Sequence, residues 1–180
     1  MDIQSQDIAN LPPYLLWGPA ASLFLVLALI PLMKLMAFKT GYTDQPGGRK
    51  KHEDSIPLVG GLAVFPVFIA VSALFIKDWA LYAPLFTAIF VLLGVGAWDD
   101  RFHVRASLKF FAQIFAAVLV VFWGGAYING LGNLLGFGGI WLGFLKETFA
   151  LVAMVLLINS TNLMDGLDGL AGGVGFIVSI

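Results

Sequence analysis

The chain is divided into long runs without a single charged side chain, and these runs decide what it can fold into. The uncharged runs are residues 8–33, 55–76, 79–98, 110–145, 148–164 and 169–180. A helix needs about 20 predominantly apolar residues to cross the hydrocarbon core of a bilayer. Four runs reach that length, and residues 148–164 reach it with their flanks. Since 59% of the residues are hydrophobic and 12% are charged, we predict an integral membrane protein.

The predicted fold is all-α, a polytopic transmembrane helix bundle with five complete spans and the start of a sixth. The predicted spans are residues 13–37, 57–76, 80–98, 107–123, 146–164 and a last one from 169 onward. The second span should have Ser55 as its cap and Pro57 in its first turn, where a proline is tolerated. Residues 1–180 are expected to form a single membrane-embedded domain.

Residues 124–143 are predicted to be a loop outside the membrane, although they lie in the longest uncharged run. They include eight glycines, which is too many for a stable helix interior. One interfacial turn is expected around residues 140–145.

Lysines and arginines are unevenly distributed between the predicted loops, and this asymmetry orients the bundle. One side of the membrane carries Lys34, Lys39, Arg49, Lys50, Lys51, Arg101, Arg105 and Lys109, while the other carries Lys77 and Lys146. The positive-inside rule therefore places residues 38–56, 99–106 and 159–168 in the cytoplasm and the N-terminus outside. The first ten residues contain no basic side chain, so the first apolar run is predicted to be an anchor rather than a cleaved signal peptide.

The first predicted cytoplasmic loop carries a compact cationic patch, Arg49-Lys50-Lys51-His52. Such a patch suits anionic lipid head groups or phosphates. The plain alternative is that these charges only set the topology. Gly60-Gly61 after the loop favour a function, because paired glycines allow close approach of a helix or a ligand.

Two adjacent acids, Asp99 and Asp100, close the uncharged run 79–98. Ionised groups at the end of an apolar helix are costly unless they are paired, hydrated or metal-bound. One interpretation is that Arg101 or Arg105 neutralises them. The other is a hard divalent cation, because oxygen ligands in a chain without cysteine and with two histidines suit magnesium rather than zinc.

A second polar motif closes the run 148–164 and continues beyond it, with Asn159, Asn162, Asp165 and Asp168 at every third position. Neighbours in this series share a helix face, although its ends do not. Glycines directly follow both acids, so the backbone can break there and Asp168 can cap the next span. Capping alone leaves Asn162 and Asp165 unexplained, and this favours a functional site.

Three motifs in this order resemble one family, the polyprenyl-phosphate N-acetylhexosamine-1-phosphate transferases. The motifs are Asp44-Gln-Pro46…Arg49-Lys50-Lys51-His52…Pro57-Leu-Val-Gly60-Gly61, Gly96-Ala-Trp-Asp99-Asp100-Arg101, and Asn159-Ser-Thr-Asn162-Leu-Met-Asp165-Gly-Leu-Asp168-Gly. The loop is most similar to that of the bacterial undecaprenyl-phosphate N-acetylglucosaminyl-1-phosphate transferases. The resemblance covers about residues 38–173.

The resemblance implies a multi-pass enzyme of the bacterial inner membrane with a cytoplasmic active site and magnesium, or manganese, as its cofactor. Such enzymes move a sugar-1-phosphate from a UDP-N-acetylhexosamine to undecaprenyl phosphate and release UMP. This is the first membrane step of a cell-surface polysaccharide pathway, such as cell wall or lipopolysaccharide O-antigen biosynthesis. The expected partners are undecaprenyl phosphate, the UDP-sugar and the lipid bilayer, without nucleic acid, and a homodimer is also considered.

Carried over by position, the resemblance assigns roles to individual residues. Asp99 and Asp100 are the expected catalytic pair, with Asp99 accepting a proton from the lipid phosphate or orienting it. The expected metal residues are Asp100, Asn162 and Asp165. The expected substrate-binding residues are Arg49, Lys50, His52, Arg105, Asp165 and Asp168. Direct attack by the lipid phosphate and a covalent aspartyl intermediate both stay open.

The family continues with a Gly-Asp metal motif and a His-rich loop that these 180 residues lack. We therefore expect the N-terminal part of a longer enzyme, inactive by itself. A cation or proton transporter fragment would instead place acids along a path deep within the spans, whereas here they cluster at one face. A structural subunit would not need Asn162 and Asp165 together near a helix end.

Overall fold

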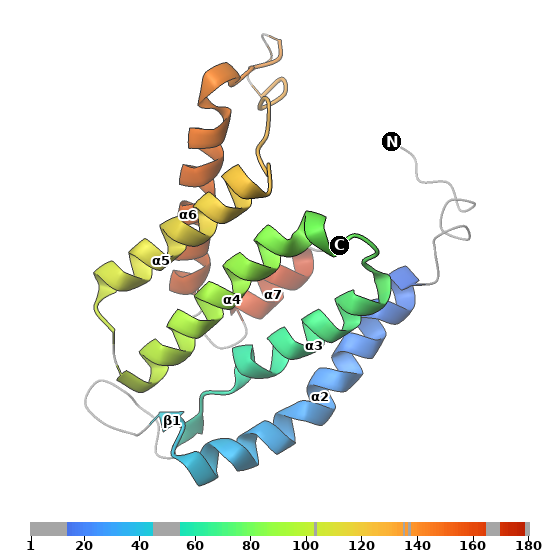
Figure 1. The fold of residues 1–180 in the computed structure, drawn as a ribbon, viewed down its shortest axis with the longest axis vertical. Coiled ribbons are helices and arrows are strands. Elements are labelled where there is room, and N and C mark those ends of the chain that lie inside the picture. Colours follow the sequence, from blue (N-terminus) through green and yellow to red (C-terminus); the bar gives the residue numbers. More distant parts are fainter. Residues whose placement is uncertain are drawn as a thin grey trace. The chain divides into compact units, whose positions relative to one another are not determined.

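The computed structural model describes residues 14–44, 55–102, 104–134, 136, 138–164 and 170–178, which are largely helical (Figure 1). The helices are α2 (Tyr14–Thr40), α3 (Gly60–Phe75), α4 (Trp79–Phe102), α5 (Ala106–Val118), α6 (Lys146–Met164) and α7 (Leu170–Val178). A helix therefore lies at each predicted span. Within the described residues, four segments are long and apolar enough to cross a membrane: Trp17–Thr40, Trp79–Phe102, Ala106–Trp123 and Gly143–Asn162. The total number of spans and the side on which the N-terminus lies stay predictions.

The surface of these helices is apolar, while their contacts are made by small side chains. Phe24, Leu74 and Leu157 are 72%, 76% and 67% exposed. Among the described residues, the buried side chains are mostly those of alanines and valines, such as Ala63 and Val121. Helices in lipid pack through small residues and turn their large apolar side chains outward, so this distribution fits a bilayer.

One compact unit contains α2, α3 and the last turns of α4. α2 and α3 lie side by side (Figure 1), and Gly18 near the start of α2 is so close to the Phe75 ring near the end of α3 that a Cβ would lie 3.3 Å from it. The two helices are therefore antiparallel. α2 ends at Thr40 because Gly41 adopts a φ of +68°, the left-handed conformation that terminates many helices.

A short strand pair closes the base of the loop between α2 and α3. β1 (Thr43–Asp44) is antiparallel to β2 (Ile56–Pro57), with Thr43 opposite Pro57. The prediction that Pro57 lies in the first turn of a helix capped by Ser55 is therefore wrong, because the backbone at this position is extended in the strand pair. The helix begins at Gly60 and has 16 residues, so it is shorter than the predicted span 57–76.

The second compact unit contains residues 80–96 of α4 together with α5, α6 and α7. α5 continues into a π-helical turn, η1 (Leu119–Trp123), and the two together match the predicted span 107–123. Gly124 follows this turn, where a Cβ would lie 2.5 Å from the Val120 carbonyl oxygen. A glycine is therefore required where the wide turn ends.

The glycine-rich segment after η1 is not helical where the structure describes it, as predicted. Its two arms are joined by backbone hydrogen bonds from Leu131 N to Ile140 O (2.8 Å) and from Ile140 N to Gly132 O (3.0 Å). A 3₁₀ turn, η2 (Gly143–Leu145), leads directly into α6 and confirms the turn expected at residues 140–145.

Prolines lie inside three of the described helices. Pro19 and Pro31 lie inside α2, Pro66 inside α3 and Pro84 inside α4. A proline inside a helix removes one backbone hydrogen bond and crowds the preceding turn, so each of these positions weakens its helix locally. α5 and α6 contain no proline.

Candidate functional site

The acid pair lies in the last turn of α4. The helix continues to Phe102, beyond the predicted end of the span at residue 98, and the Trp98 and Phe102 rings pack one turn apart at 5.8 Å between centroids. Asp99 and Asp100 lie beyond the apolar run but still within the helix, because residues 99–102 include no glycine or proline that would end it. Asp99 is half-buried and Asp100 is exposed. Since adjacent residues point about 100° apart, the two acids have different surroundings.

Tyr42 connects the base of the first loop to this acidic turn. Its hydroxyl donates a hydrogen bond to the Ala97 carbonyl oxygen at 2.9 Å and lies 3.4 Å from Oδ2 of Asp100. The backbone of Tyr42 is held as well, since its N–H donates to the Ala37 carbonyl oxygen at 2.9 Å. The residue between the end of α2 and β1 therefore contacts the turn that bears both acids.

The surroundings of Tyr42 favour its protonated form. Partial burial raises the pKa of the phenol, and the negative charge of Asp100 and the hydrogen bond to it raise the pKa further, while Arg101 lowers it. The hydroxyl is therefore a hydrogen-bond donor at neutral pH.

Arg101 is exposed and directly follows the acid pair in α4, so the alternative in which it balances the acids stays open. Asp99 and Asp100 both take part in further polar or electrostatic contacts, so neither carboxylate is without a partner. Arg105 is exposed and directly precedes α5, where its carbonyl oxygen accepts a hydrogen bond from Leu108 N at 3.0 Å. Its guanidinium is thus carried at the N-terminal end of a helix.

The polar end of α6 is joined to α5 by an amide pair. Asn159 Nδ2 donates to Oε1 of Gln113 at 2.6 Å and to the Val155 carbonyl oxygen at 2.8 Å. Both side chains are half-buried. Asn162 lies almost one turn further along α6 and is exposed. Asn159, the first residue of the second polar motif, is therefore bonded to α5, three positions before the predicted metal ligand Asn162.

The other predicted site residues lie outside the described part of the chain: Arg49, Lys50, His52, Asp165 and Asp168. Within the described part, no three His, Asp or Glu side chains gather in a way that could hold a metal ion. The carboxylates of Asp99 and Asp100 and the amide of Asn162 fit a hard divalent cation in kind, since all offer oxygen ligands. Their roles stay predictions.

Tyr42 and Gln113 are candidate site residues that the sequence did not reveal. Each contacts a motif residue 58 or 46 positions away in the chain. The only local signal was a polar side chain, Gln113, within an apolar helix.

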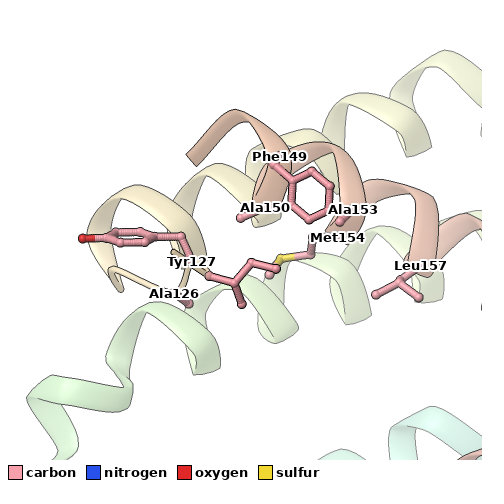
Figure 2. A pocket seen from close by; sticks show the side chains of 8 residues that line it. Ala126, Tyr127, Phe149, Ala150, Ala153, Met154 and Leu157 are labelled. Carbon is pink, nitrogen blue, oxygen red and sulfur yellow. The ribbon is translucent and has the colours of Figure 1, made fainter. Parts of the chain in front are cut away.

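An open apolar groove of about 430 Å³ lies along α6 and under residues 126–128. Figure 2 shows Phe149, Ala150, Ala153, Met154 and Leu157 of α6 along it, with Tyr127 at one end. The Tyr127 ring also lies 4.1 Å below the Lys146 ammonium group. Apart from this phenol the lining is apolar, so the groove does not belong to the candidate site.

Comparison with known proteins supports the resemblance drawn from the motifs. The model of the family "Glycosyl transferase family 4" matches residues 82–180. The chain is 32% identical over 152 residues to an undecaprenyl-phosphate alpha-N-acetylglucosaminyl 1-phosphate transferase of Yersinia pestis, covering 84% of this chain and 41% of that protein. It is 34% identical over 164 residues to a probable undecaprenyl-phosphate N-acetylglucosaminyl 1-phosphate transferase of Bacillus subtilis, covering 87% and 44%.

A third relative has the same name as the first. The undecaprenyl-phosphate alpha-N-acetylglucosaminyl 1-phosphate transferase of Escherichia coli K12 is 33% identical over 143 residues, with 79% of this chain and 39% of that protein covered. The chain thus spans about two fifths of the length of the curated relatives it matches. No solved structure matches it.

Proposed function

Since this chain belongs to glycosyl transferase family 4, we propose that it is part of an enzyme that transfers N-acetylglucosamine-1-phosphate from a UDP-sugar to undecaprenyl phosphate. The observation that carries the proposal is the extent of the family match, because residues 82–180 include both the acid pair and the second polar motif. The names of the relatives supply the acceptor and the transferred sugar.

The proposed reaction exchanges one phosphorus–oxygen bond for another. A phosphate oxygen of undecaprenyl phosphate attacks the β-phosphorus of the UDP-sugar, and the bond from this phosphorus to the oxygen that bridges it to the α-phosphorus breaks. UMP leaves with that oxygen, and the sugar stays on the transferred phosphorus as a lipid-linked pyrophosphoryl sugar. The lipid phosphate is the nucleophile, so the protein chiefly has to position two anions and offset their repulsion.

The residues of the motifs have different proposed roles in this reaction. Asp99 orients the lipid phosphate or accepts its proton, and the cations Arg49, Lys50, His52 and Arg105 hold phosphate oxygens. Asp168 contributes to the substrate pocket. Asp100, Asn162 and Asp165 would hold the divalent cation, with Asp165 also toward the substrate. When bound, magnesium supplies positive charge to the pyrophosphate.

The contact made by Tyr42 supports the proposal that the basic loop and the acid pair contribute to the same site. Tyr42 ties the base of the first loop to the turn that bears Asp99 and Asp100, within a single compact unit. A membrane-bound acceptor requires a site at the membrane surface. The basic residues of the loop favour the cytoplasmic face of the bacterial inner membrane.

The test replaces each acid by its neutral amide in the full-length protein. If the pair served only to balance nearby arginines, Asp99→Asn and Asp100→Asn would be tolerated, because exposed ion pairs contribute little. We expect each variant to lose most transfer of radiolabelled sugar phosphate to undecaprenyl phosphate, and Asp100→Asn also to raise the magnesium requirement. Asp78→Asn is the matched control, since Asp78 is an exposed acid just before the other end of α4. Near-normal turnover of both variants, at equal amounts of protein in the membrane, would remove the proposed site.

A further inference from the structure

Gln113 and Asn159 form a hydrogen bond between two apolar helices. Gln113 lies in the candidate span Ala106–Trp123 and Asn159 in the candidate span Gly143–Asn162. An amide without a partner is costly in apolar surroundings, and lipid offers it none. The 2.6 Å bond between these side chains therefore holds two apolar helices together by a directional contact.

Apart from the amide pair, the buried side chains of α5 and α6 are small and apolar. The buried residues of α5 are Ala112, Ala116 and Ala117, and the buried residue of α6 is Val155. Alanine methyl groups let helices approach closely, but they do not fix how one helix is rotated or shifted against the other. The amide pair adds the directional contact that such a surface lacks.

Asn159 also constrains its own helix. Both of its N–H groups are used, one by Gln113 and the other by the Val155 carbonyl oxygen. The side chain is thus fixed to its own backbone at one point and to α5 at another. A rotation of α6 about its axis would break one of the two bonds.

We propose that Gln113 is a positioning residue, which acts through Asn159 to set the rotation of α6 and thereby the direction of Asn162. The inference rests on the proposed function, in which Asn162 is a metal ligand. Asn162 follows Asn159 by three residues, so its direction is fixed relative to Asn159 by the helix. A side-chain tip lies about 6 Å from the helix axis, so a rotation of 10° moves it by about 1 Å. A misplacement of about 1 Å can lower an enzymatic rate by about 100-fold.

The first experiment measures transfer by the full-length enzyme in membranes. In Gln113→Leu the size is nearly kept while the bond to Asn159 is lost. We expect kcat to fall by roughly 10- to 100-fold and the magnesium concentration for half-maximal rate to rise, while KM for the UDP-sugar changes little. The matched control is Thr87→Val, because the Thr87 hydroxyl donates a hydrogen bond at 2.7 Å to the Ala83 carbonyl oxygen of its own helix and therefore joins no second helix by that bond.

A swap of the two side chains tests the bond itself. Gln113→Asn and Asn159→Gln alone change the combined length of the pair and should each lose activity. Together they restore that length with the same donors and acceptors, and we expect the double variant to be at least about fivefold more active than either single variant. A double variant no better than the single ones would overturn the proposal.

The second readout does not depend on catalysis. The chain has no cysteine, so introduced cysteines can report the register of α5 against α6. Gln113 contacts Asn159, while residues 126–128 lie beside the earlier part of α6 from Phe149 to Leu157, so the chain there runs opposite to α6. Residues 117 and 155, one turn away on each helix, should therefore also face each other. We expect Ala117→Cys with Val155→Cys to form a disulfide on mild oxidation, in full-length protein without other reactive cysteines, and Gln113→Leu to lower its yield.

The outcomes separate the two proposals. If the unaltered enzyme does not transfer, or Asn162→Ala transfers normally, the proposed function or its metal site fails. If Asn162→Ala is inactive while Gln113→Leu matches Thr87→Val in kcat, magnesium dependence and disulfide yield, the proposed function stands and the role of Gln113 is refuted.

Discussion

Removing the Tyr42 hydroxyl tests how firmly the first loop is fastened to the acidic turn. Tyr42→Phe keeps the ring and deletes the donor that lies 2.9 Å from the Ala97 carbonyl oxygen and 3.4 Å from Oδ2 of Asp100. The ring is partly buried, so its packing should be retained. The loss is therefore that of one hydrogen bond between residues far apart in sequence.

The expected cost follows from the geometry. A hydrogen bond of ordinary length contributes about 0.5–1.5 kcal/mol to stability, and the 3.4 Å contact adds little. We expect the free energy of unfolding to fall by about 1 kcal/mol. For a chain of 150–250 residues this corresponds to a decrease of about 2–4 °C in Tm, and in a longer full-length protein the decrease is smaller.

The pH dependence of this cost has a definite sign. The pKa of Tyr42 is raised in the folded protein above the usual value of about 10. The folded state therefore holds the phenolic proton more tightly than the unfolded state does. This contribution to stability is fully present below about pH 10 and is lost as the pH rises through the folded pKa. The difference between the unaltered protein and Tyr42→Phe should accordingly shrink above pH 10.

The assay is thermal unfolding of full-length protein in detergent at pH 7, 9 and 10.5, with Tyr82→Phe as the control. Tyr82 is an exposed residue of α4. If Tyr42→Phe and Tyr82→Phe have the same Tm at every pH, the hydroxyl does not fasten the loop, and the argument from its geometry is refuted.

Three further predictions concern topology, metal and the glycine-rich segment. Reporter fusions near residues 45 and 103 should report cytoplasm and those near residues 78 and 130 the outside; a cytoplasmic signal at residue 130 would overturn the assigned spans. Chelation of divalent cations should abolish transfer by the full-length enzyme and magnesium should restore it, whereas full activity in excess chelator would exclude the metal role. Gly130→Ala should lower stability by about 1–3 kcal/mol in thermal unfolding, because its Cβ would lie 2.6 Å from the Ile140 carbonyl oxygen. Gly139→Ala, whose Cβ would meet the Trp141 side chain at 3.6 Å, should cost less, and equal losses would contradict this explanation.

The positions of the helices could be predicted because the signal for each is local. The predicted span 146–164 coincides with α6, which starts at the charged pair Lys146-Glu147. Boundaries were less accurate where charge and helix do not end together. α4 continues through Asp99 and Asp100 to Phe102, because polar residues can leave the membrane without leaving the helix. α3 starts late, because pairing between β1 and β2 holds the residues before it in an extended conformation.

The candidate site could be predicted only as far as its motifs reach. Asp99, Asp100 and Asn162 were recognisable because polar residues at the ends of apolar runs are conspicuous. Tyr42 and Gln113 were not, because each acts through a contact between segments far apart in the sequence. No local pattern encodes which tyrosine or glutamine will meet an acid or an amide after folding.

Because a proline weakens α4 near its start, a small bend there would displace the distant end of the helix by a large amount. Asp99 lies 15 residues beyond Pro84, which is about 22 Å along the helix axis. A bend of 10° at the proline would carry the acids sideways by about 4 Å, more than the length of a hydrogen bond. Because the Tyr42 hydroxyl bonds to the Ala97 carbonyl oxygen near the acids, a displacement of this size would break that hydrogen bond. The position of the carboxylates therefore depends on that hydrogen bond as well as on the straightness of α4.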